Sequence, residues 1–132
     1  MIGLALDIRN ARLNAIRDAV DAGGSAGTLS IYDGQRPYTG GPVTRKLAEF
    51  KLSYPCAADA EDAVLVFDHV TECKSAEADG KATWARITDS NGKFAADCFA
   101  GVGNEDVRLK TAEIHQGMKV EVRRASIWEG NR

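Results

Sequence analysis

A hairpin signal in the middle of the chain constrains its fold more than any other feature. Apolar and polar side chains alternate through residues 80–97, on either side of Asp89, Ser90, Asn91 and Gly92. Asn-Gly between alternating apolar positions is the strongest short-range signal for a hairpin, because both residues tolerate the positive φ that such turns demand. The sequence therefore predicts a strand, a tight turn and a return strand over residues 81–99.

The N-terminal part of the chain follows a helical period instead. Residues 4–22 place apolar side chains along one stripe and charged side chains over the rest of the surface; the stripe contains Leu6, Leu13, Ile16 and Val20. Gly23 and Gly24 end the pattern, because glycine readily takes the left-handed conformation that closes a helix. We expect an amphipathic helix that docks through Leu13, Ile16 and Val20.

From Thr28 onward the pattern favours short strands. Alternation predicts strands over residues 28–32, 46–54, 106–114 and 118–128, and an uninterrupted apolar run predicts a central strand over residues 63–70. In the last strand the apolar positions are 118, 120 and 122 and then 125 and 127, a change from one face to the other that indicates a bulge near Arg123 and Arg124.

This organisation predicts a mainly β fold. Several short strands with turns between them are typical of an antiparallel β-sandwich, here jelly-roll-like, with one N-terminal helix. The chain of 132 residues is long enough to bury a core that needs no disulfide or metal ion to stabilise it. We expect one domain over residues 1–132, with the helix at about 4–22 and the sandwich at about 27–129.

Composition argues against several classes of partner. A net charge of −2 gives no electrostatic attraction to nucleic acid, and the longest apolar run is shorter than the roughly 20 residues that span a bilayer. The three cysteines are an odd count without metal-ligand spacing, as in a reduced cytosolic chain. We expect no nucleic-acid partner, no membrane, no metal and no cofactor.

Candidate catalytic groups are sparse. His69 shares a predicted strand face with Leu65 and Phe67, so we expect it to pack at the edge of the core, and we expect His115 to be exposed. The acidic residues cluster in connectors, where solvated turns are commoner than the facing carboxyl pair of a glycosidase. We expect no enzymatic activity and no catalytic residues.

Two segments carry large aromatics where the predicted fold has no core to fill. One is the Pro- and Gly-rich loop over residues 35–45, and the other is the end of the last strand. Exposed aromatics beside arginine are typical of interfaces. The predicted interface residues are Arg36, Pro37, Tyr38, Arg123, Arg124 and Trp128.

The order of these segments resembles a family of small tailed-phage and prophage proteins that are virion-structural or unassigned. The resemblance covers nearly the whole chain, through residues 7–16, 27–34, 47–52, 80–97, 109–114 and 118–127. It implies a capsid decoration, or cement, protein that binds the major capsid protein of a tailed bacteriophage. We then expect a homo-oligomer in the virion, made in the cytoplasm of the bacterial host.

Two other functions remain open at this stage. The same resemblance fits a small tail or head–tail connector component. A carbohydrate-binding β-sandwich module belongs to a different class, and it would use exposed aromatics in a row, for which only Tyr38 and Trp128 are candidates.

Overall fold

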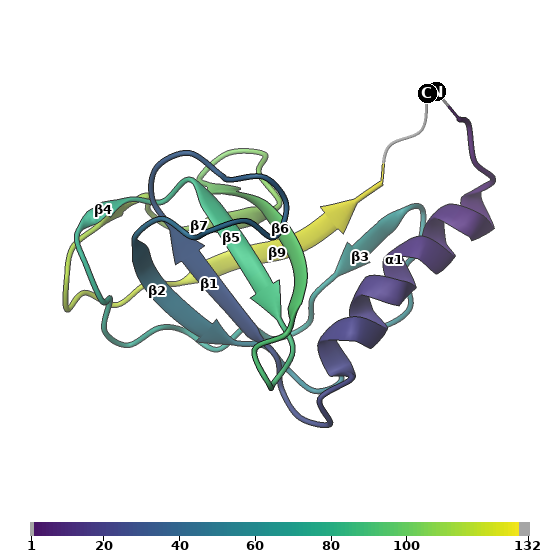
Figure 1. The fold of residues 1–132 in the computed structure, drawn as a ribbon, viewed down its shortest axis with the longest axis horizontal. Helices are drawn as coiled ribbons and strands as arrows, with labels where there is room; N and C mark the ends of the chain where they lie inside the picture. Colours follow the sequence, from purple (N-terminus) through teal and green to yellow (C-terminus); the bar gives the residue numbers. More distant parts are fainter. Residues whose placement is uncertain (1, 130–132) are drawn as a thin grey trace.

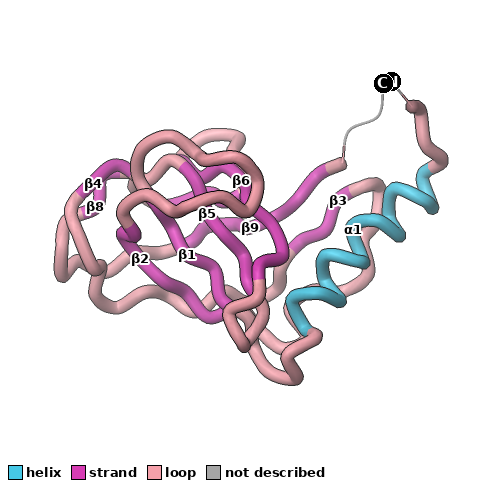
Figure 2. The backbone as a smooth tube through the Cα atoms, viewed as in Figure 1, coloured by secondary structure: helices cyan, strands magenta, loops and turns pink. Residues whose placement is uncertain are grey.

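The computed structural model describes residues 2–129 and is mainly β, with one helix packed beside a curled sheet (Figures 1 and 2). Its elements are α1 (Leu6–Asp21), β1 (Thr28–Tyr32), β2 (Lys46–Lys51), β3 (Val64–Val66), β4 (Gly80–Lys81), β5 (Trp84–Thr88), β6 (Phe94–Gly101), β7 (Val107–Leu109), β8 (Glu113–Ile114) and β9 (Val122–Trp128). Seven strands join in the order β2-β1-β5-β6-β7-β9-β3, and β4 pairs with β8.

The predicted hairpin is confirmed as β5 and β6. The N–H of Gly92 donates to Asp89 O at 3.1 Å, and the Asp89 carboxylate accepts from the N–H groups of Asn91 and Lys93, each at 2.8 Å. Within the turn only Gly92 takes a positive φ, of 84°, so the turn uses the freedom of the glycine and not that of Asn91. Pairing outward from the turn places Arg86 opposite Asp97.

The sheet is mixed, which corrects the antiparallel expectation. β6 and β7 run parallel, with Ala100 opposite Val107, because the chain between them turns back alongside β6 before β7 begins. The other strand pairs are antiparallel. The jelly-roll-like sandwich stays a prediction, since hydrogen bonds link seven strands into one curled sheet.

Several predicted strands are shorter or placed differently. The run 63–70 forms only β3, which lies at the end of the sheet order and not at its centre, with Leu65 buried and Val66 43% exposed. The run 106–114 divides into β7 and β8. The predicted bulge is confirmed: Arg108 lies opposite Arg124 and Leu109 opposite Val122, so Arg123 is the extra residue.

Alternation decides which side of the sheet forms the core. In β1 and β5 the inward residues Leu29, Ile31 and Ile87 are fully buried in the main hydrophobic cluster. The intervening residues, among them Tyr32, Trp84 and Arg86, point to the outer side. The sheet therefore has a second, outward layer that is aromatic and charged.

The helix docks as expected over its C-terminal two thirds. Leu13 and Val20 are buried and Ile16 packs against the core, whereas Leu6 and Ile8 are 47% and 48% exposed. The helix ends at the glycine pair, where Gly24 has a φ of 83°.

Candidate functional site

The loop 33–45 lies across the outer side of β5 and β6, and we call it the strap (Figure 1). A buried ion pair holds it. Arg86 donates to both carboxylate oxygens of Asp97, at 2.7 and 3.0 Å, and the Asp97 side chain is fully buried. Each partner also binds the strap backbone: Gly40 N–H donates to Asp97 Oδ2 at 2.9 Å, and Arg86 donates to Gly41 O at 2.8 Å.

The ion pair stays charged near neutral pH. Burial on its own would raise the pKa of Asp97, but the hydrogen bonds from Arg86 and from the Gly40 N–H outweigh it and lower the pKa below its ordinary value of 3.8. The hydrogen bond to Asp97 correspondingly raises the pKa of Arg86. The strap is thus tied down by a charge-assisted network.

Aromatic rings form the surface on which the strap rests. Tyr32 and Trp84 stack with centroids 4.4 Å apart, and the Arg86 guanidinium lies over the rings of Trp84 and Phe94 at 5.4 and 5.2 Å. The indole N–H of Trp84 reaches the strap itself, donating to Asp33 O at 3.1 Å and to Thr44 Oγ1 at 2.9 Å. The strap is therefore a fixed part of the structure at both of its ends.

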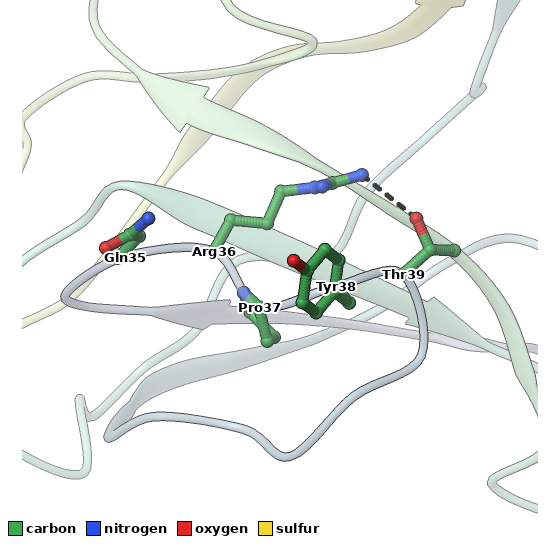
Figure 3. A pocket seen from close by; sticks show the side chains of 5 residues that line it. All are labelled: Gln35, Arg36, Pro37, Tyr38 and Thr39. Carbon is green, nitrogen blue, oxygen red and sulfur yellow. Dashed lines mark hydrogen bonds between the residues drawn. The ribbon is translucent and has the colours of Figure 1, made fainter.

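The strap apex (residues 35–39) borders an open hollow of about 600 Å³ (Figure 3). Tyr38 is 95% exposed, the highest exposure among the large hydrophobic residues described. Arg36 extends along the loop towards Thr39, with a long 3.4 Å hydrogen bond to its hydroxyl, and lies over the Phe99 ring at 5.3 Å. Its Nε is buried without a hydrogen-bond partner in residues 2–129. The apex thus offers an aromatic ring and an incompletely bonded guanidinium.

The other predicted interface residues belong to a separate surface on β9. Trp128 is 63% exposed and lies opposite Val64 of β3, and Arg123 and Arg124 are exposed at the bulge. In the sheet order β6, β7 and β9 lie between β5 and β3. The structure therefore divides the six predicted residues into two groups: Arg36, Pro37 and Tyr38 on the strap, and Arg123, Arg124 and Trp128 on β9.

A hollow of about 430 Å³ accompanies the second group, and we call it the acidic hollow. Its lining includes Val64, Val66 and Arg124 together with the carboxylates Asp59, Glu61, Asp62 and Asp68. The tight turn over residues 61–64 shapes it: the N–H and O groups of Glu61 and Val64 bond to each other, at 2.9 and 3.1 Å. Asp62 and Ala63 take positive φ values of 52° and 61° there, the conformation of a type I′ turn.

Polar side chains of α1 hold the connector 56–63 in place. Asn14 Oδ1 accepts from Ala60 N–H at 2.7 Å, and Asn10 Oδ1 accepts from Ala63 N–H at 2.8 Å. The Asp21 carboxylate accepts from Cys56 N–H at 3.1 Å. These residues follow a helical spacing of four and seven, so one polar stripe fastens the connector to the helix.

Three features near these surfaces were not predicted from the sequence: an exposed apolar pair, the buried ion pair and the acidic hollow. Phe99 and Val102 are 54% and 59% exposed beside a further hollow of about 530 Å³. The pairing of Arg86 with Asp97 could not be counted from the sequence, because regular pairing outward from the 89–92 turn would place Arg86 opposite Ala95. Instead, pairing begins with Thr88 opposite Phe94, and a register shift between Ile87 and Thr88 then brings Asp97 opposite Arg86. The acidic hollow has no signal in the sequence either, because the residues of its turn are not the glycine or asparagine that such turns usually carry.

The histidines and cysteines of the described residues do not gather at one site. Residues 2–129 contain no group of three or more His, Cys, Asp or Glu arranged to hold a metal ion. His69 is exposed, so the expected packing at the core edge is wrong; β3 ends at Val66, before the alternation reaches it. Burial raises the pKa of Cys56 and of Cys98 to about 12, so both are protonated thiols.

Comparison of the chain with protein-family models, with curated proteins and with solved structures gives no match. No helix within residues 2–129 has both the length and the apolar character needed to cross a bilayer.

Proposed function

We propose that this chain is a virion structural protein of a tailed bacteriophage, and specifically a capsid decoration protein that binds the major capsid protein. The observation that carries the proposal is the near-complete exposure of Tyr38 on a strap that a buried ion pair holds in place. An aromatic that is presented in this way costs little conformational entropy on binding, which favours a contact made many times over on a shell.

The non-enzymatic assignment belongs to the same proposal. The geometry of the strap and of the acidic hollow suits binding between macromolecules, with aromatics, arginines and carboxylates spread over open surfaces. We propose that the protein works as a homo-oligomer without a cofactor, and that it occupies the head in preference to the tail.

Incorporation into particles tests this function. Purified particles of the phage or prophage that encodes the chain should contain it in a fixed ratio to the major capsid protein, measured by quantitative mass spectrometry. Tyr38→Ala should lower that ratio at least tenfold while leaving thermal stability unchanged. Tyr54→Ala is the matched control, because Tyr54 is 54% exposed but lies outside the strap. Absence of the wild-type chain from the particles would overturn the proposal.

One observation favours carbohydrate binding as a second candidate. Gln35 and Thr39 line the same hollow as the exposed Tyr38 ring, a combination that can stack on a sugar and hydrogen-bond its hydroxyls (Figure 3). A glycan array separates the two functions: saturable binding that Tyr38→Ala abolishes supports this candidate, and an array without signal removes it.

A further inference from the structure

We propose that copies of this chain associate head to tail, with the strap apex of one copy seated in the acidic hollow of the next. This inference rests on the homo-oligomer of the proposed function and deepens it: it assigns the exposed Tyr38 to the contact between copies, a contact that can be tested in solution without any capsid. The two surfaces are complementary in shape and in charge, and both are rigid.

The two surfaces have complementary shapes. The strap apex projects the Tyr38 side chain into solvent, with 95% of it exposed. The acidic hollow measures about 430 Å³ and has an apolar part formed by Val64 and Val66, the latter 43% exposed. A phenol ring can bury its apolar body against these valines and keep its hydroxyl near the carboxylate rim. Trp128, which lies opposite Val64, supplies a second exposed aromatic beside the contact.

The two surfaces also have opposite charge. The strap apex carries Arg36 and no acidic residue. The acidic hollow carries four carboxylates, and the arginines that offset them are Arg124 in its lining and Arg17, which bonds to Asp59. The hollow therefore keeps a net negative charge, carried mainly by Glu61, Asp62 and Asp68.

Arg36 is the residue whose own bonding is incomplete. Its Nε is buried without a hydrogen-bond partner in residues 2–129, and its Nη2 makes one long bond of 3.4 Å to Thr39. A buried polar group of this kind calls for a partner, and a guanidinium binds a carboxylate with two parallel hydrogen bonds. A small rotation of Arg36 towards a carboxylate of the next copy would supply that partner.

Both surfaces are already held in shape. Asp97 and Arg86 fix the strap at Gly40 and Gly41, while Asn10 and Asn14 fix the connector that forms one wall of the hollow. Association would therefore order few additional groups, which lowers its entropic cost.

The placement of the two surfaces sets the symmetry. The strap lies over β5 and β6, and β3 lies beside α1 at the other end of the molecule (Figures 1 and 2). Val64 and Val66 of β3 line the acidic hollow. Each copy thus has one of each surface, and the contact is not self-complementary. Such a heterologous contact produces closed rings or open rows of copies, and not a two-fold dimer.

The test uses two variants, each of which lacks one surface. Arg36→Glu/Tyr38→Ala removes the strap contact, and Glu61→Lys/Asp68→Lys removes the hollow contact. Lys74→Glu makes the same charge change as the strap variant, and Glu113→Lys makes the charge change of one of the two hollow substitutions; both lie at exposed positions outside both surfaces and serve as controls. Mass is measured by sedimentation velocity from micromolar concentration to ~1 mM, where even a contact worth about 4 kcal/mol is half formed.

We expect the wild-type chain and both controls to form oligomers larger than a dimer as concentration rises. Each surface variant alone should be a monomer. An equimolar mixture of the two variants should form a 1:1 dimer and nothing larger, because each variant keeps the one surface that the other has lost. Raising the salt to about 1 M, where the Debye length falls to about 3 Å, should weaken association of the wild type.

Several outcomes would overturn the proposal. A wild-type chain that stays monomeric at ~1 mM has no such contact. A surface variant that still forms oligomers places the contact elsewhere, and a mixture that stays monomeric, with both variants folded by circular dichroism, shows that the two surfaces do not meet. If a double variant does not fold, Tyr38→Ala alone replaces it on the strap side and Glu61→Lys alone on the hollow side. A chain that associates as expected but is missing from particles would refute only the decoration function.

Discussion

The strap and the connector 56–63 are both irregular segments fixed by side chains of regular elements, but the means of fixing them differ. The middle of the strap depends on one fully buried carboxylate, Asp97, and on its arginine partner. The connector depends on separate hydrogen bonds from Asn10, Asn14 and Asp21 along the helix. Loss of the ion pair should therefore release the middle of the strap in one step, while Trp84 still holds its ends, whereas the connector should loosen one bond at a time.

Removing the carboxylate of the strap should have the largest effect on stability. Asp97→Ala leaves the Arg86 guanidinium, whose side chain is 14% exposed, without its ionic partner. Breaking a buried pair in this way costs about 3–5 kcal/mol, measured as the free energy of unfolding in urea. Asp18→Ala is the control, because that carboxylate is 70% exposed in a surface pair with Arg17 and should cost less than about 1 kcal/mol. Equal losses in the two variants would refute the comparison.

Truncation of a buried helix residue should have the next largest effect. The connector is bonded to side chains of α1, so it depends on how firmly α1 packs against the sheet. Leu13 is 2% exposed, so Leu13→Ala should lower the free energy of unfolding by about 2–5 kcal/mol. Leu6→Ala, at the exposed end of the same stripe, should change it by less than about 1 kcal/mol. A loss below about 0.5 kcal/mol for Leu13→Ala would mean that the stripe is a contact face and not part of the core.

Loss of one connector bond should have a smaller and local effect. Asn14→Ala leaves the Ala60 N–H without its acceptor, and an unsatisfied buried donor costs about 1–3 kcal/mol. Hydrogen exchange of the Ala60 amide should accelerate while the Gly40 amide in the strap stays protected. Asn104→Ala, at an exposed turn position, is the control. Simultaneous loss of protection at both amides would show that strap and connector open together.

The contrast also shows which features could be predicted from the sequence. The helix, the β5–β6 hairpin and the bulge at Arg123 come from local patterns, and each is found where its pattern lies. The parallel pairing of β6 with β7 and the edge position of β3 depend on contacts between distant segments, which periodicity does not encode. The bonds from Asn10 and Asn14 join residues about fifty positions apart, so the part of the helix surface that holds the connector could not be predicted from the helical period.

In the candidate site, too, some features follow from local patterns and others depend on how the chain folds. The exposure of Tyr38 and Trp128 follows from their place outside any core pattern, whereas the carboxylates of the hollow gather only because of the left-handed turn at Asp62 and Ala63. Residues 61–64 contain no glycine, so the sequence does not predict a left-handed turn there.

The pH dependence of the strap should be the smallest of these effects. The pKa of Asp97 is lower in the folded chain than its ordinary value of 3.8, so the unfolded chain takes up this proton first as the pH falls. The stabilisation is therefore complete above about pH 4 and is lost progressively below it. Protonation removes the charge but leaves the carboxyl in place, so the loss should be smaller than in Asp97→Ala. Unfolding in urea between pH 5 and 2.5 measures it, with Asp97→Asn as the reference. The wild type should lose more stability than this variant over that range, and parallel curves would show that other carboxylates cause the acid sensitivity.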